Sequence, residues 1–289
     1  MEKPKVVLIT GASSGIGKAT AIEMRGRGWR VFATVRRETD AVELTQVGRG
    51  LIEPLIMDVT DQASVERALA IIQERAGRLD ALVNNAGIAV GGPVEMLTSE
   101  DLQQQFDVNV LGMHRVTRAA LPMLREARGR IVNVSSVAGQ EVFPFHGAYA
   151  ASKHAVEALS DALRMELHGV VKVIVIQPSA VSTPMWETAT DMEFTPSADY
   201  PAEEVERLAR LYRRVGARGV EPGVAGKAIG NALELPWPLP YWIVSKQPPL
   251  AIHLMRLLPR FITDQLKLRT IGWPPKGRRT NDGRPTTDY

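Results

Sequence analysis

Tyr149 and Lys153 stand four residues apart in this sequence, and Ser136 precedes them. On a helix, that spacing places the phenol and the ammonium on one face. A nearby positive charge favours phenolate and lowers the pKa of a tyrosine toward neutrality, where a general acid or base works best. Ser136 adds a hydroxyl that can donate to the same reacting oxygen. The pattern indicates chemistry that interconverts an alcohol and a carbonyl. The alternative, which is the more common reason for Tyr and Lys at this spacing, is a partly solvent-exposed face of a helix.

A glycine-rich turn lies near the start of the chain. The β-branched run at 5–10 is typical of a buried parallel strand, and it leads into a helical pattern that begins near Lys18. Glycines between a strand and a helix let the backbone approach a pyrophosphate, and the helix N-terminus offers free N–H groups. We therefore expect a dinucleotide to contact Gly11, Ser13, Ser14, Gly15, Ile16 and Gly17. The alternative is an ordinary strand–helix turn.

Two arginines follow the next predicted strand, at 29–34. A site for NAD places a carboxylate at this point to bind the ribose 2′-hydroxyl, whereas this chain has Arg36 and Arg37 and no acid before Glu38. Arginine presents a charged, planar fork of donors that suits a 2′-phosphate. We therefore predict NADP(H) rather than NAD(H). The alternative is that both arginines are surface charges.

Taken together, these motifs resemble the short-chain dehydrogenase/reductase family. The resemblance covers about residues 4–190 and rests on motifs in the family's order and spacing: 10–17 (Thr-Gly-Ala-Ser-Ser-Gly-Ile-Gly), 84–87 (Asn-Asn-Ala-Gly), Asn109, Ser136 and Tyr149-x-x-x-Lys153. Two stretches, 30–36 and 182–186, look most like members that act on steroids, retinoids or similar lipids.

The resemblance implies roles for the catalytic residues. Tyr149 would be the general acid/base, and Lys153 would lower its pKa and hold the nicotinamide ribose. Ser136 would polarise the substrate oxygen, and Asn109 would anchor a water in a proton relay.

For the cofactor, the resemblance implies that Asp58 with its neighbour Val59 binds the adenine. Asn84 with Asn85, Ala86 and Gly87 would shape the cofactor floor, and Pro178 and Thr183 would lie at the nicotinamide carboxamide. Ser179 departs from the family, which usually has glycine there.

The elements that must position these residues alternate along the chain. Apolar, strand-like runs recur with helical patterns between them, which predicts a parallel sheet with helices on both faces. We predict one α/β domain over 1–271, a Rossmann-type doubly wound sheet with strands at 5–10, 29–34, 51–57, 80–84, 129–135 and 171–177. The predicted helices are at 15–27, 61–76, 101–124, 149–168, 202–215 and 221–235, and the family resemblance implies a final short strand at 241–245. The candidate site residues fall where strands end, which is where such sheets bind ligands.

The regular alternation stops after the sixth strand. We expect a substrate lid over 184–220, with Met185, Trp186, Met192 and Phe194 either lining a pocket or packing into the core. An apolar extension follows at 236–271. Within 250–268, Leu254, Leu257, Leu258 and Phe261 form a stripe that lies on a membrane surface or, as we favour, packs on protein. The tail at 272–289 has the composition of a disordered segment.

Composition narrows the function class. The 289 residues include no cysteine, which excludes disulfides and thiol chemistry and fits a cytoplasmic protein. We expect no signal peptide, because only four residues precede the first strand, and no membrane-spanning run. The net charge of +3 is too small to suggest nucleic-acid binding, and the five histidines show no metal-ligand spacing. His146 either reaches the substrate or lies on the rim of the site.

These observations predict hydride transfer between NADP(H) and a carbonyl or secondary alcohol of a hydrophobic small molecule. The family resemblance implies a homo-oligomer of two or four copies. Two alternatives remain. One is a cofactor-binding regulator without turnover, although such proteins typically lose the Tyr or the Lys. The other is the longer epimerase branch, which has a different glycine spacing and a larger C-terminal domain.

Overall fold

The computed structural model describes residues 3–48, 51–190, 197, 199–248, 250, 252, 254 and 257–273. Among these residues, seven parallel strands form one sheet in the order β3-β2-β1-β4-β5-β6-β7. The strands are β1 (Val6–Ile9), β2 (Arg30–Val35), β3 (Ile52–Ile56), β4 (Ala81–Asn84), β5 (Arg130–Val134), β6 (Lys172–Pro178) and β7 (Tyr241–Val244). Each predicted strand overlaps an observed one, and the predicted doubly wound α/β fold is confirmed.

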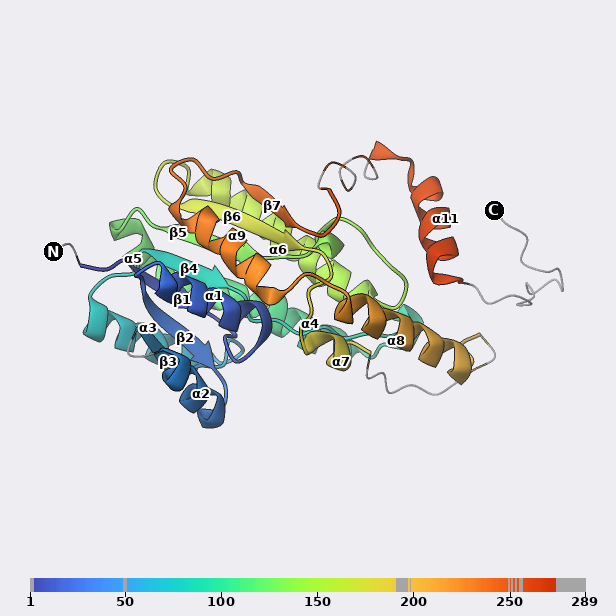
Figure 1. The fold of residues 1–289 in the computed structure, drawn as a ribbon, viewed down its shortest axis with the longest axis horizontal. Helices are drawn as coiled ribbons and strands as arrows, with labels where there is room; N and C mark the ends of the chain where they lie inside the picture. Colours follow the sequence, from blue (N-terminus) through green and yellow to red (C-terminus); the bar gives the residue numbers. More distant parts are fainter. Residues whose placement is uncertain are drawn as a thin grey trace.

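Helices cover both faces of the sheet (Figure 1). One face packs against α1 (Gly15–Gly26), α2 (Glu38–Gly48) and α9 (Pro222–Glu234). The other packs against α3 (Gln62–Ala76), α5 (Met113–Glu126) and α6 (Gly147–Glu166). Side chains of a strand alternate between the two layers, so in β1 Val7 and Ile9 join the first core and Val6 and Leu8 the second. This burial on both faces explains why the strands are continuous apolar runs.

The order of the strands reverses between β1 and β4. From β1 the chain proceeds outward to β2 and β3, and from β4 it proceeds the other way, to β5, β6 and β7. In open α/β sheets, ligands bind beyond the carboxyl ends of the strands at this reversal. The glycine turn follows β1, and the Asn-Asn-Ala-Gly motif begins at the end of β4, so both lie at this point of the sheet.

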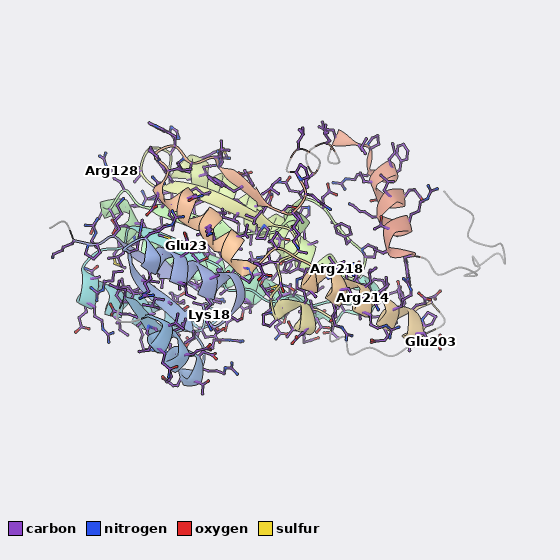
Figure 2. The ribbon with its side chains drawn as sticks, viewed as in Figure 1. Lys18, Glu23, Arg128, Glu203, Arg214 and Arg218 are labelled. Atoms are coloured by element: carbon purple, nitrogen blue, oxygen red, sulfur yellow. The ribbon has the colours of Figure 1, made fainter. Side chains whose placement is uncertain are left out.

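Two helical regions differ from the sequence prediction. The helix α2 was not expected, because its pattern is weak and it buries only Ala41, Leu44 and Gly48. Its position beside α1 is held by an ion pair of 2.5 Å between Glu43 and Lys18, which Figure 2 labels at the start of α1. The helix expected at 101–124 consists of α4 (Ser99–Phe106), a π-helical segment (Asp107–Gly112) and α5.

The C-terminal extension ends in α11 (Arg260–Ile271), set apart from the sheet layers (Figure 1). Lys267 pairs with Glu141 at 2.6 Å, and the guanidinium of Arg207 on α8 (Ala202–Ala217) donates to the carbonyls of Ile271 and Gly272 at 2.9 and 3.0 Å. Trp273 packs edge-on against Phe145, with ring centroids 5.2 Å apart. The helix is thereby attached to the loop before α6.

This attachment corrects the boundary of the predicted tail. Gly272 and Trp273, assigned to the tail at 272–289, belong to the packed segment, and Gly272 ends α11 with φ +65. The rest of the tail, 274–289, lies outside the described residues. The stripe predicted within 250–268 is exposed where it is described: Leu254, Leu257, Leu258 and Phe261 are 54%, 80%, 39% and 71% accessible. Among the described residues, no helix combines the length and the apolar character needed to cross a membrane.

Candidate functional site

The glycine turn accepts no side chains at its key positions. Gly11 and Gly15 have φ of +66 and +55, in the left-handed region that favours glycine. A Cβ on Gly17 would collide with the carbonyl oxygen of Gly11 and the amide of Asn85. The helix α1 then begins at Gly15 without a side-chain cap from Ser14 and without an acid in its first turn. Its N–H groups are therefore open to an anion.

Asn85 and Thr10 hold this turn in place. The Asn85 amide donates to the carbonyls of Thr10 and Gly11, both at 2.9 Å, and the Thr10 hydroxyl accepts from the backbone N–H groups of Asn85 and Ala86 at the same distance. Asn84 behaves differently from what we expected. Its side chain is buried in the core, where its amide donates to Thr117 and Asn133, so it supports the sheet rather than the cofactor floor. Gly87 lies close to the side chain of Asn109.

The two arginines after β2 have different surroundings. Both are exposed, but Arg37 is paired with Asp40 through two hydrogen bonds of 3.0 and 2.8 Å. The charge of Arg36 instead acts on Asp58. Burial opposes ionisation of Asp58, yet hydrogen bonds from Thr60 together with the positive charges of Arg36 and Arg115 lower its pKa. Arg36 is thus close enough to an ionised Asp58, beyond β2 and β3, for its charge to stabilise that carboxylate.

The side chain of Val59 does not reach this region. It is buried in the core, where Gly112 packs against it, so only its backbone can meet a ligand.

Ser136, Tyr149 and Lys153 come together at the carboxyl end of β5. The Ser136 hydroxyl lies near the phenol of Tyr149 and acts to lower its pKa. Lys153 is buried, and its ammonium donates to the carbonyl of Val134 at 2.8 Å and lies 5.7 Å from the centre of the Tyr149 ring. Three groups of the predicted types therefore share one small region on β5 and α6.

Burial changes the acid–base properties of this group. We expected the neighbouring lysine to lower the pKa of Tyr149. Desolvation instead raises it, and the nearby Ser136 hydroxyl only partly offsets this effect. Desolvation also lowers the pKa of Lys153 to about 8, against the opposing charge of Glu157. At neutral pH Tyr149 is therefore a protonated phenol beside an ammonium.

Asn109 lies in the π-helical segment between α4 and α5. Its side chain exchanges hydrogen bonds with the backbone of Ile88, at 2.8 and 3.0 Å, and donates to Ser152 at 3.1 Å. Such segments are rare and often lie at functional sites, because they change the pairing of backbone carbonyls. Gln105, which the sequence did not single out, makes a second bridge from Ile88 and Val90 to Ser152. Asn109 and Gln105 thus connect the segment after β4 to α6.

Glu157 is a further residue that sequence reasoning missed. This buried carboxylate follows Lys153 by one helical turn. It accepts hydrogen bonds from Ser135 at 2.8 Å, Gln177 at 2.7 Å and Gln140 at 2.8 Å. The residue thus connects the ends of β5 and β6 to the helix that carries Tyr149. The available signal in the sequence was an acid four residues after the lysine, on the same face of the helix.

The loop after β6 closes the site opposite the glycine turn. A Cβ on Gly15 would lie 2.9 Å from the Thr183 methyl, so the two loops are in contact. The carbonyl of Pro178 accepts a hydrogen bond from Ser136 at 3.3 Å. Ser179, which replaces the usual glycine, donates its N–H to Val244 at 2.9 Å and is accommodated within the sheet edge.

The lid region is described in part. Trp186 on α7 (Met185–Thr188) donates to the carbonyl of Val181 at 2.8 Å, and its ring lies against Gly216 of α8. Both helices lie beyond one end of the sheet (Figure 1). Trp186 and Met185 are partly accessible, as a pocket lining requires, whereas Met192 and Phe194 lie outside the described residues. His146 is 9% exposed and packs on Tyr212 and Trp186, so it is buried behind the rim.

Comparisons with known proteins agree with this geometry. The family model described as short chain dehydrogenase matches residues 5–193. A 3-ketodihydrosphingosine reductase of Bacteroides thetaiotaomicron is 36% identical over 78% of this chain and 82% of its own. An NADPH-dependent 3-dehydrocapnine reductase of Ornithobacterium rhinotracheale is 36% identical over 77% and 85%. Retinol dehydrogenase 16 of Mus musculus is 40% identical over 73% and 72%.

Solved structures show the same architecture. A short-chain dehydrogenase from Streptomyces avermitilis superposes with a TM-score of 0.77 at 31% identity, over 94% of this chain and 98% of its own. A serine dehydrogenase complexed with NADP+ has a TM-score of 0.71 at 28% identity, over 83% and 94%. With the glycine turn, the Tyr–Lys pair and these similarities in hand, the chain belongs to the short-chain dehydrogenase/reductase family, the oxidoreductases that bind a nicotinamide dinucleotide.

Proposed function

We propose that this protein transfers hydride between NADP(H) and a carbonyl or secondary alcohol of a hydrophobic small molecule, with Tyr149 as the general acid/base. The observation that carries the proposal is that Tyr149, the buried Lys153 and Ser136 come together at the carboxyl end of β5, with the lysine ammonium 5.7 Å from the centre of the Tyr149 ring. A raised pKa keeps the Tyr149 proton in place at neutral pH, which suits protonation of a carbonyl oxygen.

The residues around the glycine turn fit a dinucleotide. Gly17 leaves room only for backbone approach, and the uncapped start of α1 offers N–H donors to a pyrophosphate. Asp58 would bind the adenine, the backbone of Val59, Ala86 and Gly87 would line the floor, and Pro178 and Thr183 would lie beside the nicotinamide. The bound nicotinamide supplies or accepts the hydride.

Arg36 is the better candidate for the 2′-phosphate. Arg37 is occupied by Asp40, whereas the guanidinium of Arg36 makes no hydrogen bond or ion pair to a described side chain and interacts only with the charge of Asp58. A phosphate would add a strong acceptor for its guanidinium. The preference for NADP(H) is also supported by the relative named NADPH-dependent and by the neighbour complexed with NADP+.

The chain's own residues move and hold the proton. Ser136 orients the reacting oxygen, and Tyr149 gives its phenolic proton to that oxygen during reduction. Lys153, charged below a pKa of about 8, stabilises the phenolate that results. Asn109 and Gln105 fix Ser152, which donates to the Tyr149 carbonyl at 2.7 Å, so the helix that carries Tyr149 is held from one side.

A hydrophobic substrate is supported by the partly accessible Met185 and Trp186 beyond the sheet and by the relatives named for retinol and ketodihydrosphingosine. Assembly into two or four copies, a cytoplasmic location, and contact of 250–268 with a membrane surface stay predictions.

The first experiment titrates NADPH and NADH separately and then follows cofactor oxidation with ketosteroids, retinal and aliphatic or aromatic ketones. Tyr149→Phe is expected to reduce turnover by about 100-fold or more while NADPH still binds. Tight NADPH binding without turnover of any carbonyl would instead favour a regulator.

A second pair of variants tests the cofactor preference. Arg36→Ala is expected to raise the KM for NADPH by about 10-fold or more, because a charge-assisted contact is lost, and to leave the KM for NADH nearly unchanged. Arg37→Ala is expected to have a smaller effect, since Asp40 already pairs with that side chain. An unchanged NADPH/NADH ratio in both variants would contradict the phosphate assignment.

A further inference from the structure

His146 occupies the junction between the catalytic helix and the lid. It is the residue immediately before α6, three positions ahead of Tyr149, and its side chain is 9% exposed. Its ring centroid lies 4.2 Å from that of Tyr212 on α8 and 6.2 Å from that of Trp186 on α7, both in edge-on contacts. The imidazole is thus enclosed by the elements that frame the proposed substrate region.

The protonation of this imidazole follows from its neighbours. Nδ1 lies 3.3 Å from the carbonyl oxygen of Pro144, and because a carbonyl only accepts, Nδ1 carries the proton. Burial lowers the pKa of His146, so the ring is neutral at neutral pH. Nε2 is therefore a bare hydrogen-bond acceptor.

No described residue donates to Nε2. The two aromatic neighbours have donors, but both are turned to backbone carbonyls: the Tyr212 hydroxyl donates to Pro144 at 2.9 Å and the Trp186 indole to Val181 at 2.8 Å. An unpaired buried acceptor costs about 1–3 kcal/mol. A donor that arrives with a ligand would remove this cost.

We propose that His146 Nε2 accepts a hydrogen bond from a hydroxyl or amino group that the substrate carries close to its reacting carbon. The assignment rests on the proposed function, because it takes Tyr149 as the proton donor to the carbonyl. His146 immediately precedes the helix that carries Tyr149, and its ring packs against Trp186 and Tyr212 of the region proposed to cover the substrate. The substrate class is then a hydrophobic hydroxy- or amino-ketone, or the corresponding diol or amino alcohol.

The experiment compares three ketones with the same alkyl chain, bearing an α-hydroxyl, an α-amino or an α-methoxy group, in reactions with NADPH. The methoxy compound keeps the oxygen of the hydroxy compound but has no donor. Because it is larger by one methyl group, the deciding quantity is the change in preference between wild type and the His146 variants. Wild type is expected to prefer the hydroxy or the amino ketone over the methoxy ketone by about 10- to 100-fold in kcat/KM. Which of the two is preferred identifies the donor.

His146→Phe keeps the aromatic contacts and removes the acceptor. This variant is expected to bring the preference close to one, with the KM for NADPH unchanged. His146→Gln restores an acceptor and is expected to recover part of the preference, which a purely structural role would not produce. His154→Phe makes the same substitution at an exposed position of α6 and is expected to leave the preference intact.

The outcomes separate the two proposals. Turnover with the same hydroxy-to-methoxy ratio in wild type and His146→Phe would overturn the His146 assignment and leave the proposed function standing. If wild type with bound NADPH reduces none of the three ketones, nor any carbonyl of the wider series, the proposed function fails, and the His146 assignment fails with it.

Discussion

Replacement of Lys153 by methionine tests whether burial of the lysine charge lowers the free energy of unfolding. Burial lowers the pKa of this lysine from 10.5 to about 8. That interval corresponds to about 3 kcal/mol of unfavourable free energy when the ammonium is charged in the folded chain. Methionine has a similar unbranched stem and no charge. The variant should therefore escape this cost, even though it loses the hydrogen bond to Val134.

The pH dependence makes the prediction specific. Below about pH 8, Lys153 is charged in both the folded and the unfolded chain, and the cost is fully present. Between about 8 and 10.5 the folded chain loses this proton first, so unfolding takes up a proton and the free energy of unfolding rises with pH. The difference between wild type and Lys153→Met should therefore shift in favour of wild type by about 2–3 kcal/mol between about pH 7 and about pH 10.

Urea unfolding of both proteins without cofactor measures this difference. The other titrating groups, such as the buried Tyr212, contribute to both proteins and cancel in the comparison. A difference that stays flat across this range, or that moves against wild type, would refute the reasoning that Lys153 is a desolvated ammonium.

Three further predictions follow from contacts around the site. Glu157→Gln removes the negative charge that favours the charged form of Lys153, so the lysine pKa should fall below about 8 and the alkaline limb of the kcat/KM profile should move to lower pH. The control is Glu166→Gln at an exposed position of the same helix. An alkaline limb that does not move in Glu157→Gln would contradict the influence of Glu157 on Lys153. A chain ending after Trp273 should have the same free energy of unfolding as the full chain. A chain ending after Ile271 should lose about 1–3 kcal/mol of that free energy, because the contacts of Gly272 and Trp273 are removed. Equal urea midpoints for the two truncated chains would contradict this prediction. Gly17→Ala should weaken NADPH binding by about 10-fold or more, because the new Cβ collides with Gly11 and Asn85. The control is Gly26→Ala on the same helix, whose Cβ meets open space and which should bind NADPH as wild type does. Equal Kd values for the two variants in a fluorescence titration would exclude an effect of the collision on binding.

Most of the sheet was predictable because the inner strands β1, β2, β4, β5 and β6 are buried on both faces and leave largely apolar runs in the sequence. The glycine turn was predictable for a related reason, since its backbone conformation and close contacts leave little choice of residue. Family resemblance then named Ser136, Tyr149, Lys153 and Asn109, and the structure brings the first three together. The roles of these residues stay predictions.

The remaining features depend on packing between distant segments. Asn84 belongs to the core because Thr117 and Asn133 meet it there, and neither partner is near it in sequence. The raised pKa of Tyr149 depends on how deeply its hydroxyl is buried, which spacing along a helix does not reveal. The end of the packed chain was misplaced because Trp273 is followed by a proline- and charge-rich stretch and finds its partner, Phe145, far away in sequence.

Because α11 is attached to the loop before α6, the C-terminal segment is separate from the part of the chain that forms the glycine turn and the sheet. Its described contacts lie in the loop before α6, at Tyr200 and on α8, and none of these belongs to the strands or the glycine turn. Residues after Pro259 can therefore diverge, or be exchanged with those of a relative, without disturbing the dinucleotide half. A fold arranged in this way can keep one hydride-transfer chemistry while its C-terminal segment adapts to molecules of different shape.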